Sequence, residues 1–169
     1  MKRFIFPVLF LLLIAACSVY LEAEILTVTI KEPIHPITAE IIVKSIEKAS
    51  QEKAELVIIK LNTPGGLDSS MREIIEAIIG SPVPVVAYVS PAGARAASAG
   101  LFIAVACDIF AMAPGTSTGA AHPVSIGSSG QEQDKTMEEK VTHDAAAYIR
   151  TLAEKRGRNI QMAEDAVRK

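Results

Sequence analysis

Three features of this sequence could together hydrolyse an acyl bond: a serine among small residues, a glycine-rich turn and a lysine. Ser98 lies in a run of alanine and glycine at 96–100, a Thr-Pro-Gly-Gly turn occupies 63–66, and Lys140 follows further along the chain. A serine hydroxyl attacks a carbonyl only with a base beside it, and the resulting oxyanion needs backbone N–H donors. The alternative interpretation is that Ser98 packs inside an alanine-rich helix.

Strands alternating with helices are expected to position these groups. The apolar periodicity predicts strands at 24–30, 56–61, 83–89 and 108–113. It predicts helices at 38–53, 68–80, 97–104, 137–155 and 159–169. Segments 90–95 and 114–130, the second rich in Gly, Ser and Thr, are expected to be loops. Such an order predicts an α/β fold with right-handed crossovers and a mainly parallel sheet covered by helices.

The glycine turn and the serine are expected to meet at one edge of this sheet. Gly65 and Gly66 come directly after one predicted central strand, and Ser98 follows the loop after the next. In open α/β sheets, sites gather beyond the carboxyl ends of the strands. The N–H groups of Gly66 and Ala99 are therefore candidates to hold the oxyanion, Ala99 because the residue after the nucleophile serves this purpose in other hydrolases.

Composition indicates one domain and argues against several functions. The chain has 169 residues, half of them hydrophobic, and a formal net charge of −2. That length and apolar content suit a single domain with a real core. The charge gives no reason to expect nucleic acid as a partner. We expect no metal or cofactor, because the sequence shows no zinc-ligand cluster and no phosphate-binding glycine loop. The two cysteines, Cys17 and Cys107, do not indicate a disulfide framework.

Residues 1–22 have the pattern of a secretory signal peptide or a membrane anchor. Two basic residues precede a nearly uncharged run at 4–21. The run is close to the roughly 20 residues that span a bilayer. Residues 14–17, which end at Cys17, also resemble a bacterial lipoprotein processing site. With the basic residues inside, the rest of the chain is expected to lie outside the cytoplasm.

The sequence resembles the NfeD family of membrane-bound serine proteases, which have a ClpP-like, crotonase-like fold and are related to the signal-peptide peptidase SppA. Three motifs in order carry the resemblance: LNTPGGL at 61–67, AASAG at 96–100 and MAPGTSTGAAHP at 112–123. The resemblance implies that residues 23–169 are a ClpP-like serine protease domain, truncated at its C-terminus. Asn62 stands where an aspartate is common in the family, which need not affect the chemistry if it only supports the turn.

The family resemblance further implies a catalytic dyad of Ser98 and Lys140. A lysine accepts a proton only where burial against apolar groups disfavours its ammonium form. Lys140 is thus expected to fold from a polar segment onto a hydrophobic cleft. Its acidic neighbours Glu138 and Glu139 favour the opposite interpretation, a solvated lysine, and Lys135 is the other candidate for the base.

A second mechanism uses histidine in place of lysine. His122 follows Ser98 by 24 residues (122 − 98 = 24), a separation that resembles the one in ClpP. An orienting aspartate would complete a triad, with Asp108, Asp134 and Asp144 as candidates. If it is not catalytic, His122 is expected to support the site by shaping the loop before Pro123.

These features together predict a membrane-associated serine endopeptidase that cleaves apolar peptide segments. The resemblance implies a stomatin-like membrane protein as partner and assembly into a homodimer or a larger homo-oligomer. Two alternatives remain at this stage. One is a non-catalytic, membrane-organising scaffold on the same fold. The other is a crotonase-like acyl-thioester enzyme, which Ser98 and the leader disfavour.

Overall fold

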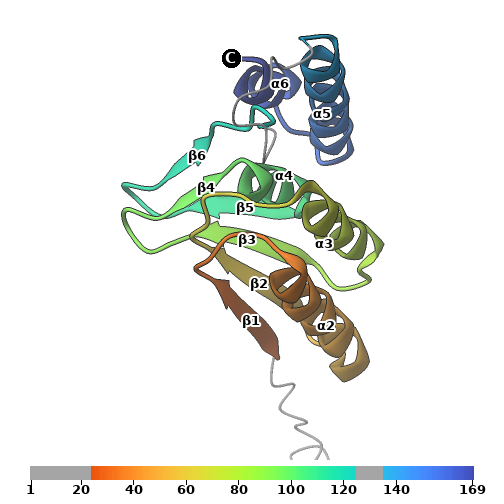
Figure 1. Cartoon of the computed structure of the whole chain (residues 1–169). Helices are drawn as coiled ribbons and strands as arrows, with labels where there is room; N and C mark the ends of the chain where they lie inside the picture. Colours follow the sequence, from red (N-terminus) through yellow and green to blue (C-terminus); the bar gives the residue numbers. More distant parts are fainter. Residues whose placement is uncertain (1–23, 125–134) are drawn as a thin grey trace, which may run out of the picture.

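The fold is built on a parallel sheet with helical crossovers (Figure 1). The computed structural model describes residues 24–124 and 135–169. The sheet has the order β1-β2-β3-β5, with all neighbours parallel. Its strands are β1 (Ile25–Ile30), β2 (Leu56–Leu61), β3 (Val85–Val89) and β5 (Ile109–Met112). The crossovers contain α2 (Pro36–Glu52), α3 (Asp68–Gly80) and α4 (Ala99–Ala106).

The three crossover helices cover one face of the sheet. Successive strands are added in one direction, and right-handed crossovers then place every connecting helix on the same side. Consistent with this, α2 packs against α3 and α3 packs against α4. The structural relatives described below share this fold, so the expected α/β fold with a mainly parallel sheet is confirmed.

The core lies between these helices and one face of the sheet. In β2, Val57, Ile59 and Leu61 are fully buried, whereas the residues between them are half-buried. The facing helices bury Ile42 and Ile74 completely. Each such side chain contributes roughly 1.5–3 kcal/mol when removed from water. This packing fixes the carboxyl ends of β2 and β3, where the candidate site begins.

A second, two-stranded sheet corrects the predicted loops. β4 (Arg95–Ala97) pairs in parallel with β6 (Ser117–Gly119). Segments 90–95 and 114–130 were both expected to be loops, but β4 begins at the end of the first and β6 lies inside the second. Thr63 ties this small sheet to the glycine turn: its N–H donates to the Arg95 carbonyl at 2.7 Å, and its carbonyl accepts from Ala97 N–H at 3.1 Å.

Two predicted helix starts are also corrected. The helix expected from residue 38 begins at Pro36, because proline suits the first helical position and its missing N–H needs no partner there. The Thr38 hydroxyl accepts from His35 N–H at 2.8 Å and secures this start. The helix expected from residue 97 begins at Ala99, because Ala97 belongs to β4 and Ser98 has φ 51° and ψ −120°, which are not helical angles.

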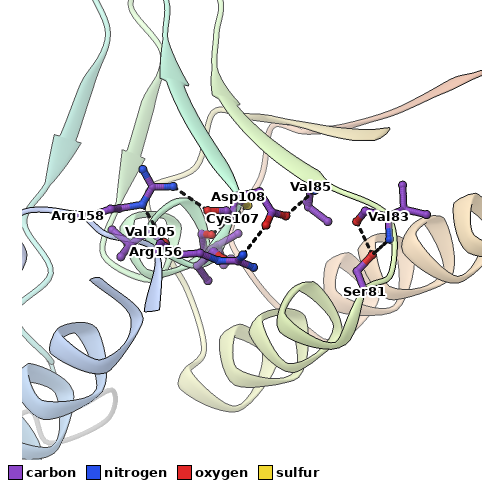
Figure 2. Close-up of polar contacts among 10 residues, drawn as sticks. Ser81, Val83, Val85, Val105, Cys107, Asp108, Arg156 and Arg158 are labelled. Carbon is purple, nitrogen blue, oxygen red and sulfur yellow. Dashed lines mark hydrogen bonds and ion pairs between the residues drawn. The ribbon is translucent and has the colours of Figure 1, made fainter. Parts of the chain in front are cut away.

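Two further helices close the described chain. α5 (Lys135–Lys155) packs against α4 and against α6 (Ile160–Arg168). Figure 2 shows how the segment between them holds the carboxyl end of α4. Arg156 Nε donates to the Ala106 carbonyl at 2.6 Å, and Arg158 donates to the carbonyls of Val105 and Cys107 at 3.0 and 2.7 Å. Arginines at a helix carboxyl end satisfy carbonyls that lack helical partners.

The expected leader at 1–22 falls outside the described residues, so its assignment as a signal peptide or an anchor stays a prediction, as does the domain boundary at residue 23. Within 24–124 and 135–169, none of the helices combines the length and the apolar character needed to cross a bilayer.

Cys107 is predicted to be unreactive while the domain is folded. Its side chain is fully buried, and burial raises the pKa of the thiol from 9.0 to about 12. The folded state thus favours the neutral thiol. The unfolded chain releases the thiol proton more readily, so the free energy of unfolding falls as pH rises from about 9 towards 12. In a Cys17→Ser variant, iodoacetamide at pH 8 should label the unfolded chain and spare the native one. Labelling of the native protein at the unfolded rate would contradict the prediction.

Candidate active site

Ser98 occupies a strained turn between a strand and a helix. It follows β4 directly and is the N-cap of α4. A φ of 51° is uncommon for a residue with a side chain, and such strain persists only where the surroundings impose it. Here the Ser98 N–H donates to the Gly119 carbonyl at 3.0 Å, and the Ser98 carbonyl accepts from Leu101 N–H at 2.9 Å. The strand-to-helix turn resembles the elbow that exposes nucleophilic serines in other hydrolases.

The glycine turn lies against this serine. A Cβ on Gly65, which has φ +113°, would stand 2.5 Å from Ser98 Cβ and 3.1 Å from its Oγ. A Cβ on Gly66 would stand 2.0 Å from the carbonyl oxygen of Ile34. Side chains at either position would therefore collide with the site or with the neighbouring backbone. Both glycines allow a close approach that alanine does not.

Two backbone N–H groups beside Ser98 are available to a ligand. Among the residues that the structure describes, Gly66 N–H and Ala99 N–H donate no hydrogen bond to a protein acceptor. Ala99 is the first residue of α4, where an N–H has no helical acceptor and the helix dipole favours negative charge. Such donors suit an oxyanion.

These groups line one cavity of about 630 Å³. Four of the sequence-predicted site residues contribute to it: Gly66, Ser98, Ala99 and Lys140. Most of the other lining residues are apolar, namely Leu67, Met71, Phe102, Ala121, Pro123, Val124, Val141 and Ala145. The remaining ones carry charges, namely Asp68, Arg72 and Asp144. The cavity is large enough for several side chains of a peptide and is mainly apolar.

Lys140 lines this cavity, but its side chain is exposed. The sequence led us to expect an amine buried against apolar groups. Lys140 stands in the second turn of α5, and the side chains that α5 buries are Ala146, Ile149, Leu152 and Ala153. The two N-terminal turns of α5 therefore extend past the core of the described chain. Their side chains remain in contact with solvent.

The structure does not bring His122 into the cavity of Ser98. His122 lines a second cavity of about 360 Å³, together with Lys135, the other candidate base. Its Nδ1 is 3.1 Å from the Val167 carbonyl, and its Nε2 is 3.8 Å from a carboxylate oxygen of Glu138. The imidazole is thus engaged with α5 and α6.

The aspartates considered as orienters have other partners. Asp108 forms an ion pair with Arg156 and accepts from Val85 N–H at 2.8 Å (Figure 2). Asp144 pairs with Arg72 at 2.7 Å. Asp134 lies outside the described residues. Among the described residues, no cluster of three histidine, cysteine, aspartate or glutamate side chains could hold a metal ion.

Sequence reasoning missed Arg72 and Tyr148. The Arg72 guanidinium stands 4.4 Å from the centre of the Tyr148 ring, and that ring stacks on Phe102 of α4. Partial burial raises the pKa of the Tyr148 phenol, so the ring stays neutral at physiological pH. The spacing of Asp68 and Arg72 by four residues was the available signal, since such pairs face each other on a helix. Their link to α5 has no signature in the sequence.

The parallel sheet, its crossover helices and the serine between β4 and α4 define the class of protein: an α/β protein with a ClpP-like fold. Residues 24–169 match the family described as NfeD1b, N-terminal domain. The chain therefore belongs to the NfeD1b family, and the resemblance noted in the sequence is confirmed.

Curated relatives agree with this assignment. The chain is 37% identical over 169 residues to the membrane-bound protease PH1510 of Pyrococcus horikoshii. This match covers 100% of this chain and 38% of the relative. The chain is also 34% identical over 116 residues to the membrane protein NfeD1b of Bacillus subtilis. That match covers 67% of this chain and 26% of the relative. The chain thus spans less than two fifths of the length of these two relatives.

Solved structures of related domains superpose well. A serine-to-alanine mutant of the 1510-N membrane-bound stomatin-specific protease matches with 39% identity and a TM-score of 0.78, over 87% of this chain and 70% of that chain. A lysine-to-alanine mutant of that protease, in complex with a substrate peptide, matches with 37% identity and a TM-score of 0.78, over 88% of this chain and 67% of that chain.

Proposed function

We propose that this domain is a membrane-associated serine endopeptidase that cleaves apolar peptide segments with a Ser98–Lys140 dyad. One observation carries the proposal: the candidate nucleophile, the candidate base and two free backbone donors, Gly66 N–H and Ala99 N–H, line the same cavity. The solved relatives support it, because one had a serine and the other a lysine replaced by alanine, the two residue types that the proposal requires.

In the first half of the reaction, Ser98 Oγ attacks the scissile carbonyl carbon while the neutral amine of Lys140 takes the hydroxyl proton. The carbonyl oxygen becomes an oxyanion that accepts from Gly66 N–H and Ala99 N–H. The intermediate collapses, the C–N bond breaks, and Lys140 returns the proton to the leaving amine. An acyl-enzyme on Ser98 remains. A water molecule then attacks the ester while Lys140 takes a proton from it. Lys140 returns that proton to Ser98 Oγ as the acyl–oxygen bond breaks, which releases the acid and free Ser98.

A bound peptide would supply the dry surroundings that the exposed Lys140 lacks in the free domain. An apolar segment that fills the cavity removes water from around the amine. Desolvation disfavours the ammonium form of a lysine, so substrate binding itself would favour the basic form. This explains how a solvent-exposed lysine could still act as the base.

The cavity lining favours apolar substrates, since Leu67, Met71 and Phe102 form much of its wall. The solved relatives are described as stomatin-specific, and on that basis we propose a stomatin-like membrane protein as the partner. We also propose that the domain lies outside the cytoplasm, next to a membrane, and forms a homodimer or a larger homo-oligomer. The relatives named above are membrane proteins.

The proposal is tested by cleavage of a fluorogenic apolar peptide by the full chain and by a Ser98→Ala variant. We expect the variant to lose cleavage by about 10³-fold or more with unchanged circular dichroism. Ser45→Ala is the matched control, because the Ser45 hydroxyl lies on the exposed face of α2 and donates only to the Ile41 carbonyl. Cleavage that survives in Ser98→Ala would come from another protease in the preparation, and would favour a non-catalytic scaffold role for this domain.

A further inference from the structure

Arg72 joins α3 to the helix that carries Lys140. Its Nε donates to Asp68 of its own helix at 2.8 Å, and its terminal nitrogen donates to Asp144 of α5 at 2.7 Å. Its guanidinium also lies over the ring of Tyr148 on α5, 4.4 Å from the ring centre. One side chain of α3 thus holds two side chains of α5 in a fixed geometry, since the guanidinium is planar and its donors are rigidly arranged.

The two partners on α5 lie on the same stripe as Lys140. Residues four apart face the same side of a helix, so Lys140, Asp144 and Tyr148 lie one above the other. Lys140, Asp144 and Arg72 all line the candidate active-site cavity. A contact that fixes Asp144 and Tyr148 therefore fixes the direction in which α5 presents Lys140.

The part of α5 that carries Lys140 lies ahead of the side chains that this helix buries. The side chains that α5 buries begin at Ala146, six residues after Lys140, so the turns before it are not held by the core. Among the described residues, the pair with Arg72 is the only ion pair between α5 and another element at the Ser98 cavity, whereas Glu138 of α5 approaches His122 at the second cavity. The pair with Arg72 links the turn that precedes the buried part of α5 to α3, which begins two residues after Gly66.

We propose that Arg72 is a positioning residue: through Asp144 and Tyr148 it holds α5 so that Lys140 faces Ser98. This inference rests on the proposed function. Half-exposed ion pairs contribute little to global stability. Loss of Arg72 is therefore expected to change the reaction rate much more than thermal unfolding.

The kinetic test compares Arg72→Met, Asp144→Asn and the double variant. Methionine keeps the unbranched apolar stem of arginine but removes the guanidinium. We expect each single variant to lower kcat by about tenfold or more with KM within about twofold, because a base that is displaced slows the chemical step and not binding. The double variant should be no slower than Arg72→Met, because both changes break the same contact.

Arg150→Met is the matched control, because Arg150 also pairs with a carboxylate between two helices, that of Glu164 on α6, but does not line the cavity. Its kcat should stay within about twofold of the wild type. A readout that needs no activity is the hydrogen exchange of amides 136–145, which should accelerate in Arg72→Met and Asp144→Asn and not in Arg150→Met.

The outcomes separate this inference from the proposed function. Wild-type kcat and unchanged amide exchange in Arg72→Met would overturn the positioning role and leave the protease assignment intact. Losses that multiply in the double variant would show that Arg72 and Asp144 act independently, and a loss confined to KM would show that Arg72 acts in substrate binding; either result also overturns the positioning role. Cleavage that survives in Ser98→Ala would overturn the proposed function, whereas faster exchange in Arg72→Met would still support the link between α3 and α5.

Discussion

A variant with alanine in place of Lys140 is expected to lose peptide cleavage while its thermal unfolding stays unchanged. A positioned general base contributes typically about 10²–10⁴ in rate, and kcat should fall by about that factor. Lys140 is exposed in the second turn of α5, so its truncation leaves no internal cavity. Such surface substitutions usually change the free energy of unfolding by less than about 0.5 kcal/mol. The measurement pairs kcat on an apolar peptide with the melting temperature.

Two further substitutions distinguish a base from a mere positive charge. Lys140→Arg keeps the charge, but a guanidinium stays protonated in proteins and cannot accept the Ser98 proton, so this variant should also be inactive. Lys135→Ala should cleave at the wild-type rate, because Lys135 lines the second cavity and not that of Ser98. Cleavage that persists in Lys140→Ala but disappears in His122→Ala would instead establish the histidine mechanism.

The parts of the site that sequence predicts are those with a local signature. The glycine turn follows an apolar strand that ends at Leu61, and the small residues around Ser98 precede an apolar helix. Parallel strands bring their carboxyl ends to one edge, so the proximity of these motifs follows from the element order alone. The close contact of Gly65 with the Ser98 side chain is consistent with this logic.

The parts that sequence missed depend on contacts without a local pattern. β4 and β6 have three residues each, too few for a period of two to be recognised. The positive φ of Ser98 results from hydrogen bonds with Gly119 and Leu101, not from the amino-acid type. Nearly continuous apolar runs such as those of β2 and β3 are typical of strands buried on both faces. Ile58 and Tyr88 are nevertheless half-buried, because the crossover helices cover one face of the sheet.

Replacement of Gly66 by alanine is expected to damage both stability and cleavage. The added Cβ would lie 2.0 Å from the Ile34 carbonyl oxygen and 2.5 Å from the Ile34 nitrogen. These are backbone atoms of a buried residue, which accepts from Leu67 N–H at 2.9 Å and donates to the Gly65 carbonyl at 2.7 Å. They cannot yield as a flexible side chain would. We expect the free energy of unfolding to fall by about 3 kcal/mol, as for severe overpacking in a core.

The same substitution should lower kcat by about 10²–10³ in the fraction that stays folded, because the turn must move and Gly66 N–H leaves the oxyanion position. Gly80→Ala is the matched control: nothing lies within 4 Å of a Cβ there and Gly80 ends α3, so the rate should stay at the wild-type level and stability should stay level or rise by up to about 1 kcal/mol. Urea unfolding and peptide cleavage, measured on the same preparations, separate the two effects. A Gly66→Ala protein that unfolds and cleaves like the wild type would show that Ile34 can move, and that the proposed oxyanion donor lies elsewhere.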